Sequence, residues 1–148
     1  MIRPAVTDDI AAVTDIVNAA YAVYLSRIGR KPGPMLDDYA ELIDAGRVHV
    51  LEDQGQIAGL VVLVPEGEVM LLDNVAVHPR MQGRGHGMKL IAFAEQRART
   101  AGCRAIRLFT HELMTENQAR YAYLGFVETH RGEERGLKRV YMTKPLAP

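Results

Sequence analysis

The sequence lacks several features that would place the protein in other classes. It has one cysteine, Cys103, so no disulfide can form within the chain, and a reducing, cytoplasmic location is expected. The 18 basic residues are balanced by 18 acidic ones, which argues against a general nucleic-acid or membrane binder. The longest uninterrupted apolar run, residues 57–64, is far shorter than the roughly 20 residues that span a bilayer.

Signals for metal binding and export are missing as well. The five histidines show no metal-ligand spacing, so no metal is expected. The segment 1–10, MIRPAVTDDI, has no apolar core, so no export signal is expected there. The chain has 148 residues, 48% of them hydrophobic, and contains no repeat or linker. This suits a single domain over residues 1–148 with its own core.

The spacing of apolar residues predicts an α/β domain with an α-rich start and a mixed sheet. Residues 27–35, RIGRKPGPM, hold two glycines and two prolines and are predicted to form a loop. Helices are expected over 7–24, 37–45, 88–101 and 115–124. Strands are expected over 2–5, 47–53, 56–64, 68–77, 105–110, 126–130 and 139–143.

Three glycines fall where the third of these helices should begin, in residues 81–90, MQGRGHGMKL. Gly83, Gly85 and Gly87 are unfavourable there, because a glycine costs about 0.5–1 kcal/mol relative to alanine inside a helix. A helix start has unpaired N–H groups and a positive dipole end, and glycines let an anion approach that backbone. The neighbourhood is basic, with seven bases and one acid over residues 78–107. The stretch therefore predicts an anion-binding turn, although a tight turn without a ligand would use the same glycines.

Two common nucleotide motifs do not fit this stretch. The Walker loop requires a Gly-Lys pair, and the chain contains none. The dinucleotide fingerprint G-x-G-x-x-G requires a third glycine three residues after Gly87, where Leu90 stands. The anion is therefore expected to be bound in another way.

Residues 71–91, LLDNVAVHPRMQGRGHGMKLI, resemble the signature of the GNAT superfamily of acyl-CoA N-acyltransferases. That signature is a strand ending in an apolar-Ala-Val-x-Pro run, followed by Q/R-x-x-G-x-G/A at a helix start, which Gln82, Gly85 and Gly87 match. A second family element is a strand followed by Asn, then Tyr four residues later, then Gly-Phe. Residues 108–126, LFTHELMTENQARYAYLGF, match it with Asn117 and Tyr121.

The resemblance implies a fold and a co-substrate. The implied fold is a mixed, mostly antiparallel sheet of about six to seven strands, splayed between the fourth and fifth strands and flanked by about four helices. The co-substrate is acetyl-CoA or coenzyme A, whose pyrophosphate would bind the turn formed by Gln82, Gly83, Arg84, Gly85, His86 and Gly87. The pantetheine arm would pair with the backbone of Val75, Ala76 and Val77, and Asn117 would contact the cofactor or else cap a helix.

The implied reaction is direct attack of a primary amine on the thioester in a ternary complex. The Val75 N–H would polarise the carbonyl oxygen, and Tyr121 would protonate the departing thiolate. Tyr121 could instead be a packing residue. Tyr123 is the competing tyrosine, on another face of the helix, and spacing favours Tyr121.

The base that deprotonates the amine is less well defined. Some family members carry a glutamate in the long strand, but Met70 and Leu71 occupy those positions here. The candidates are Asp73, His111 and Glu112, acting directly or through water, and Asp73 could equally cap a turn or form a salt bridge.

The acceptor is expected to be a small-molecule amine that enters near the loop after the first helix. Candidate contacts there are Tyr24, Arg27, Arg30 and Asp38, although this loop could also be a lid or a dimer contact. The alternatives are acetylation of protein N-termini or lysines, and a non-catalytic acyl-CoA-binding module. No nucleic-acid or membrane partner is expected. Homodimers are common in the family, but nothing in the sequence establishes one.

Overall fold

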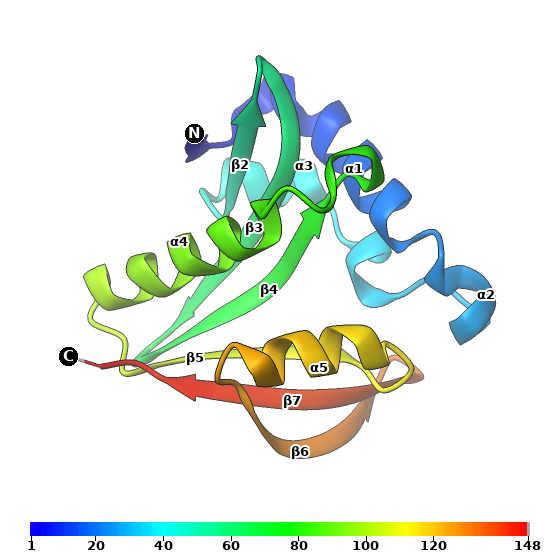
Figure 1. Ribbon diagram of the computed structural model, residues 1–148, viewed down its shortest axis with the longest axis vertical. Coiled ribbons are helices and arrows are strands. Elements are labelled where there is room, and N and C mark those ends of the chain that lie inside the picture. The colour runs from blue at the N-terminus through cyan, green and yellow to red at the C-terminus, as the bar shows by residue number, and fades with distance from the viewer. Residues whose placement is uncertain (148) are drawn as a thin grey trace.

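The computed structural model describes residues 1–147 and contains one seven-stranded sheet with helices on both faces (Figure 1). The strands are β1 (Ile2–Pro4), β2 (Val48–Asp53), β3 (Gln56–Glu66), β4 (Val69–Val77), β5 (Ala105–His111), β6 (Val127–Glu134) and β7 (Leu137–Pro145). The helices are α1 (Ile10–Tyr21), α2 (Tyr24–Ile28), α3 (Tyr39–Asp44), α4 (His86–Thr100) and α5 (Thr115–Tyr123). Short 3-10 turns cover Thr7–Asp9, Gly33–Leu36 and Pro79–Met81.

The strand order is β1-β2-β3-β4-β5-β7-β6, and only the β4–β5 pair is parallel. The connection between these two strands is helix α4, as a parallel crossover requires. This confirms the mixed, mostly antiparallel sheet and the α/β class expected from the sequence.

The sheet splays between β4 and β5, as expected. The two strands pair only where Val69–Leu72 lies beside Ala105–Leu108, and Figure 1 shows them diverging beyond that point. At the same place β4 changes register against β3, because Val62 pairs with Asn74 but Leu63 pairs with Leu72. Asp73 is therefore the extra residue of a β-bulge, which bends the strand where the splay begins.

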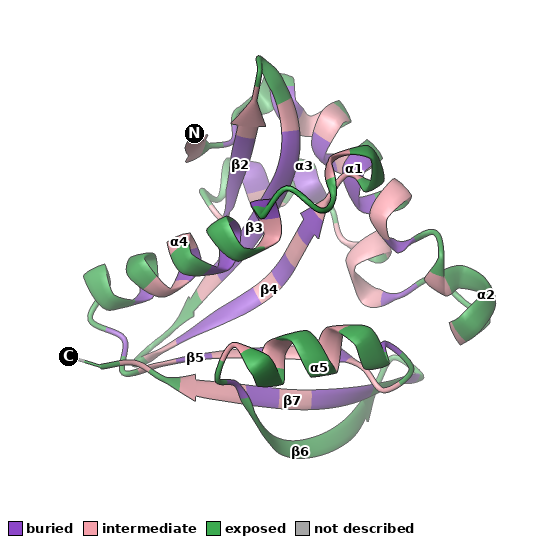
Figure 2. Ribbon diagram, in the orientation of Figure 1, coloured by how far each residue is buried: buried purple, intermediate pink, exposed green. Residues whose placement is uncertain are grey.

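Two apolar clusters, one on each face of the sheet, hold the layers together. Alternate residues of β3 face opposite sides, so Val61 packs into the cluster under α4 while Leu60 and Val62 pack into the cluster under α1 and α3. All three are fully buried. Figure 2 shows the buried colour on β2, β3, β4 and much of β7, so these strands carry the core that supports the residues at the splay.

Two elements differ from the sequence-based predictions. Residues 24–28 form helix α2 where part of the stretch was predicted as a loop, and the helix ends at Gly29, whose φ is +82°. Its five residues are too few to show helical periodicity in the sequence. Tyr24 and Ile28 pack on the apolar cluster under α1 and α3, and Arg27 pairs with Glu116 of α5. Strand β6 runs to Glu134, past the predicted end at His130. All eight of its residues are exposed, so it carries no buried alternation by which its length could be predicted.

Candidate active site

The glycine turn presents unpaired backbone N–H groups to open space. Gly83 and Gly85 have φ of +82° and +81°, and a side chain added at either would meet no atom within 4 Å. The first hydrogen bond of α4 runs from Lys89 N to Gly85 O at 3.1 Å. The N–H groups of residues 86–88 have no acceptor within residues 1–147. A helix start of this kind is suited to bind an anion, and the binding of a pyrophosphate here stays a prediction.

A groove of about 430 Å³ leads from this turn along the end of β4. Its walls come from α1, α2, β4, the turn, α4 and α5, and they include most of the residues predicted to bind the cofactor. The lining residues are Ala20, Tyr21, Val23, Tyr24, Val75, Ala76, Val77, Gln82, Gly83, Gly85, His86, Gly87, Met88, Ile91, Asn117, Arg120 and Tyr121.

The backbone of β4 offers hydrogen-bonding groups to this groove. His78 N donates to Ala58 O at 2.8 Å, which identifies a hydrogen-bonded pair of the β3–β4 ladder. Such pairs alternate along an antiparallel ladder, so Ala76 is also bonded to β3, while the N–H and C=O groups of Val75 and Val77 point to the other side. On that side β5 has diverged, so the N–H groups of Val75 and Val77 are free to pair with a ligand. Their C=O groups accept hydrogen bonds from Tyr21 Oη at 3.4 Å and from Gln82 Nε2.

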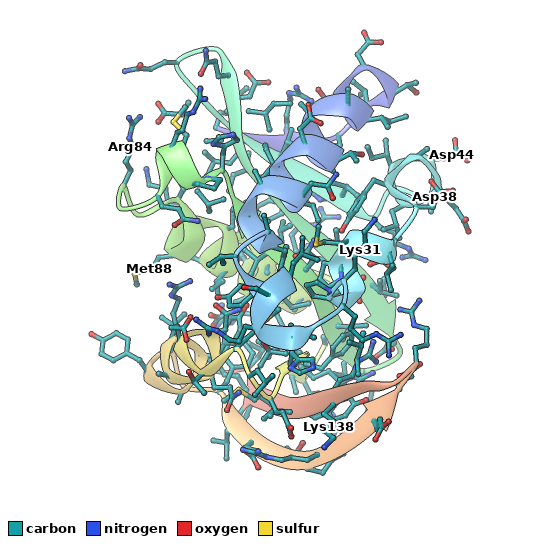
Figure 3. The ribbon with its side chains drawn as sticks, turned by 90° about the vertical axis from the view of Figure 1, so that its right-hand side faces the viewer. Lys31, Asp38, Asp44, Arg84, Met88 and Lys138 are labelled. Carbon is teal, nitrogen blue, oxygen red and sulfur yellow. The ribbon has the colours of Figure 1, made fainter. Side chains whose placement is uncertain are left out.

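Three polar side chains of the turn form contacts within the protein, and these contacts leave them fewer hydrogen bonds for a ligand. Gln82 Nε2 donates to Val77 O at 3.2 Å, which ties the turn to β4. His86 Nε2 lies 3.0 Å from Asp53 Oδ2, and Arg84 Nη1 lies 3.4 Å from the same oxygen. Arg84 is half exposed, does not line the groove and extends outward at the edge of the turn (Figure 3). Its role in cofactor binding stays a prediction.

A second, narrower cavity of about 40 Å³ lies at the splay. It shares Tyr21, Val75, Asn117 and Tyr121 with the groove, so the two spaces meet at these residues. Its remaining walls come from the 32–34 segment, the β4 bulge, β5 and β7. They include Pro32, Gly33, Pro34, Leu72, Asp73, Asn74, Leu108, Phe109, Thr110, His111, Met114, Leu137 and Arg139.

Tyr121 lies at the junction of the two spaces with its hydroxyl free. Its ring packs edge-on against Phe126 at 5.8 Å between centroids, and its hydroxyl has no partner within residues 1–147. Burial raises the pKa of Tyr121 to about 12, so the phenol stays protonated at neutral pH and can act as a proton donor. Tyr123 is 86% exposed and lines neither space, whereas Tyr121 lines both, and the catalytic role of Tyr121 stays a prediction.

Asp73 lies in the cavity wall, at the bulge of β4. Burial raises its pKa, and the positive charges of Arg139 and Arg135 work in the opposite direction. Asp37, outside the cavity wall, is coupled to it: burial first, and then the charge of Asp73, raise the pKa of Asp37 to about 6. The cavity wall therefore holds one carboxyl group with a raised pKa, Asp73, and a second such group, Asp37, lies outside the wall.

The other candidate bases are placed less favourably. His111 lines the cavity, and its Nδ1 accepts a hydrogen bond from Leu113 N at 3.1 Å. Partial burial lowers the pKa of His111, so the ring is neutral at pH 7. Glu112 lines neither space.

A series of buried hydrogen bonds anchors the bulge, and the sequence did not reveal it. Tyr21 Oη donates to Asn74 Oδ1 at 2.7 Å, Asn74 Nδ2 donates to Tyr39 Oη at 3.0 Å, and Tyr39 Oη donates to Pro34 O at 2.5 Å. The series connects α1, β4, α3 and the 32–34 segment, and so holds that segment over the cavity. In the sequence Tyr21 and Tyr39 are ordinary members of apolar helix faces, so only the fold reveals their partners.

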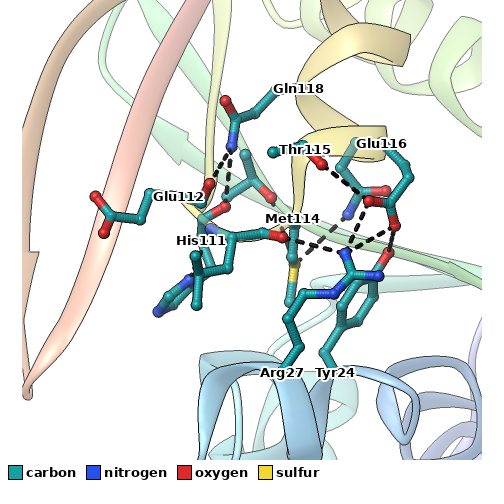
Figure 4. A network of polar contacts seen from close by, with 11 residues as sticks. Tyr24, Arg27, His111, Glu112, Met114, Thr115, Glu116 and Gln118 are labelled. Atoms are coloured by element: carbon teal, nitrogen blue, oxygen red, sulfur yellow. Dashed lines mark hydrogen bonds and ion pairs between the residues drawn. The ribbon is translucent and has the colours of Figure 1, made fainter.

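None of the four loop residues predicted to contact the acceptor lines the narrow cavity. Tyr24 lines the groove, and Arg27 Nη1 pairs with Glu116 Oε1 at 2.7 Å and donates to Leu113 O at 3.1 Å (Figure 4). Arg30 packs against Gly136, and Asp38 caps α3 by accepting a hydrogen bond from Glu41 N at 3.2 Å. The part of this stretch that reaches the cavity is 32–34.

Within the described part of the chain, no group of three or more His, Cys, Asp or Glu residues is arranged to hold a metal ion. Across residues 1–147, no helix combines the length and apolar character needed to cross a membrane.

Comparison with solved structures supports this fold. PaiA N-acetyltransferase from Thermoplasma acidophilum, solved with coenzyme A, matches with a TM-score of 0.81 at 14% identity, covering 98% of each chain. The ribosomal-protein-S18-alanine N-acetyltransferase from Escherichia coli matches with a TM-score of 0.81 at 20% identity, over 100% of this chain and 94% of that one. N-acetylglutamate synthase from Neisseria gonorrhoeae, complexed with coenzyme A and N-acetyl-glutamate, matches with a TM-score of 0.77 at 18% identity, over 100% of this chain and 35% of that one.

Comparison by sequence identifies the family. No curated protein matches the chain. The model of the acetyltransferase (GNAT) family matches residues 11–126, which is more than half of the chain and includes the glycine turn, the splay and Tyr121. The chain therefore belongs to the acetyltransferase (GNAT) family.

Proposed function

We propose that the protein transfers the acetyl group of acetyl-CoA to the primary amine of a small molecule. The observation that carries this proposal is the meeting of two spaces at Val75 and Tyr121: a long groove beginning at an anion-binding turn, and a narrow cavity containing a carboxylate. A donor with a phosphate-bearing tail fits the first space, and an amine fits the second.

The residues of the groove suit coenzyme A from end to end. The open turn at Gly83 and Gly85 and the unpaired N–H groups of 86–88 would hold the pyrophosphate. The free edge of β4 at Val75 and Val77 would pair with the amides of the pantetheine arm. Coenzyme A of PaiA and of N-acetylglutamate synthase is accommodated by the same fold. Acetyl-CoA would supply an activated acyl group as a thioester.

The chain's own groups have three tasks in the transfer. The Val75 N–H polarises the acyl oxygen while the amine nitrogen forms the new N–C bond. The C–S bond breaks, the sulfur keeps the bonding electron pair, and Tyr121 Oη gives it a proton. Asp73 receives the proton that the ammonium group loses before attack, directly or through water. The nitrogen releases its second proton to solvent as the amide forms, and solvent restores the proton of Tyr121.

A small acceptor is favoured by what covers the inner end of the cavity. Pro32–Pro34 lies on one side, and the β6–β7 turn lies on the other, where Arg30 packs against Gly136. The named acceptors of the neighbours include a ribosomal protein, and another neighbour binds an acetylated amino acid. The choice therefore rests on this chain's cavity, a narrow space walled by the 32–34 segment, β4, β5 and β7.

The proposal is tested by calorimetric titration with acetyl-CoA, followed by thiol release over a panel of amines. The panel holds polyamines, amino acids and a short peptide. We expect saturable binding and amine-dependent thiol release. Binding without release for any amine would point to a non-catalytic acyl-CoA-binding module, release only with the peptide would point to a protein acetyltransferase, and no binding at millimolar acetyl-CoA would overturn the proposal.

A further inference from the structure

Arg139, on β7, is a buried cation with unused hydrogen-bonding capacity in the cavity. Its side chain is 8% exposed, and its guanidinium carbon lies 3.9 Å from the centroid of the Phe109 ring. Nη1 donates to Glu134 Oε2 at 2.6 Å, the one acceptor that Arg139 has within residues 1–147. A guanidinium has five N–H donors, and the Nε and Nη2 donors of Arg139 have no protein acceptor within residues 1–147.

Asp73 is the matching anion on the opposite side of the same cavity. Its carboxylate has neither a hydrogen bond nor an ion pair in the described structure, which covers all but the last residue. Arg139 and Asp73 line one cavity and influence each other's charge, yet no nitrogen of Arg139 lies within 4.0 Å of an Asp73 oxygen. The two opposite charges thus line the same cavity without forming an ion pair.

We propose that the acceptor carries a carboxylate as well as its primary amine, as an amino acid does, and that Arg139 binds this carboxylate. The proposal rests on the function proposed above. The ammonium group would lie toward Asp73, next to the junction at Val75 and Tyr121, and the carboxylate toward Arg139 on β7. A planar guanidinium is the side chain best suited to bind a carboxylate through two parallel hydrogen bonds.

A purely structural role for Arg139, as the ion-pair partner of Glu134, does not explain why it lines the cavity. Glu134 has a side chain that is 60% exposed, and it forms a single contact with Arg139. A surface carboxylate of this kind does not require a partner in the buried cavity wall. A Cβ added at Gly33 would lie 3.7 Å from Nη2, which is ordinary van der Waals contact, so the 32–34 segment lies beside this end of the guanidinium. Stacking on Phe109 explains why the guanidinium lies in the wall, but it uses none of the N–H donors, and Nη2 has no protein acceptor within residues 1–147.

The first test compares acceptors in matched pairs with the wild-type protein. The pairs are L-alanine and ethylamine, L-methionine and 3-(methylthio)propylamine, and L-phenylalanine and phenethylamine. Each pair differs by the carboxylate alone. We expect kcat/KM in thiol release to be about 10- to 100-fold higher for the better amino acids than for their matched amines, the range of a hydrogen-bonded charge pair.

The second test uses Arg139→Lys and Arg139→Gln. Both variants should lose about 10- to 100-fold in kcat/KM for the amino acid, mainly through KM, and less than about 3-fold for the matched amine. Calorimetric titration with acetyl-CoA reports folding and the cofactor groove separately, and its affinity should stay within about 2-fold of wild type. Glu134→Gln, which removes the surface partner and keeps the arginine, is the matched control and should leave the amino-acid preference unchanged.

The outcomes separate the two proposals. If acetyl-CoA binds and amines without a carboxylate are acetylated as well as amino acids are, this inference is wrong and the proposed function stands. Equal losses for both members of a pair in Arg139→Gln would also overturn it. Failure of the wild-type protein to bind acetyl-CoA would instead remove the proposed function itself.

Discussion

Tyr121 combines a fixed ring with a free hydroxyl, and this makes its role testable. Tyr121→Phe keeps the packing on Phe126 and removes a hydroxyl that has no partner within residues 1–147. We expect kcat for amine acetylation to fall by about 100-fold or more, because proton donation to the thiolate is lost. The calorimetric affinity for acetyl-CoA and the midpoint of thermal unfolding should change little.

The control for this prediction is Tyr123→Phe. Tyr123 is 86% exposed and lines neither space, so its variant should retain wild-type kcat. A Tyr121→Phe enzyme with a kcat within 3-fold of wild type would show that the leaving thiolate receives its proton elsewhere.

Asp37 gives a prediction for the pH dependence of stability. Its folded pKa of about 6 lies above the value of roughly 3.9 expected for the unfolded chain, so the folded state binds more protons between these two pH values. The free energy of unfolding therefore falls as pH rises through this window. Asp37→Asn removes this loss, and the variant should exceed wild type by on the order of 1 kcal/mol at pH 7.

Urea unfolding of wild type and Asp37→Asn at a series of pH values from 4 to 7.5 checks this prediction. The two curves should converge near pH 4, where the carboxyl of the folded state is protonated, and separate as pH rises. Curves that stay parallel over the whole range would mean that the buried charge of Asp37 has no energetic cost.

The sequence identifies some residues of the candidate site and misses others. The family resemblance favoured Tyr121 over Tyr123, because Tyr121 stands at the motif's spacing, four residues after Asn117 and four before Gly125. Arg139 and Asn74 were not found, because their significance depends on neighbours from β4, β5 and α1 that are distant in sequence. A buried arginine within a strand of otherwise ordinary composition has no local signal.

The start of α4 is the element that connects fold to function. Gly87 is the second residue of the helix and has an ordinary φ, and a Cβ there would meet only Val77 Cγ2, at 4.0 Å. Gly87→Glu should raise the free energy of unfolding of the free protein by about 0.5–1 kcal/mol, since it replaces a glycine and adds an acid at a helix N-terminus. It should nevertheless weaken acetyl-CoA binding by about 10-fold or more, because the carboxylate occupies the anion site.

Gly87→Gln separates the effect of charge from that of size. Gln has nearly the same volume as Glu, so it should weaken acetyl-CoA binding less, and the difference should shrink at high salt. Urea unfolding and calorimetric titration measure the two properties in the same samples. A Gly87→Glu variant that binds acetyl-CoA as wild type does would place the pyrophosphate away from this turn.

Elements with strong local signals were predicted well, and those held by tertiary contacts were not. The positive φ of Gly83 and Gly85 and the proline after β4 are encoded locally, so the strand–turn–helix order could be read directly. Helix α2 depends on the Arg27–Glu116 contact, which joins residues 89 positions apart, and no pattern within residues 24–28 indicates it. The predicted strand 126–130 was shorter than β6, because the exposed residues of β6 show no alternation of buried and exposed positions.

At the scale of the whole molecule, the sheet consists of two arms that separate beyond Leu72. One arm is β1 to β4 with α4, and the other is β5 to β7 with α5, and the groove borders both. The splay was expected from the family resemblance, and the bulge at Asp73 supplies its local cause. A ligand in the groove would contact both arms, so its binding should stabilise the fold as a unit.

Thermal unfolding with acetyl-CoA at about 100 times its Kd should show this effect. Binding to the folded state alone adds about 2.7 kcal/mol at that concentration, which for a chain of this size corresponds to a rise of about 5–10 °C in Tm. Hydrogen exchange identifies where the ligand lies. The amides of Val75, Val77 and residues 86–88 face the groove without a partner in the described structure and should gain the most protection. Exposed β6, remote from the groove, should gain the least. A rise in Tm with protection centred on β6 would mean that acetyl-CoA binds outside the splay, and the assignment of the groove would then be wrong.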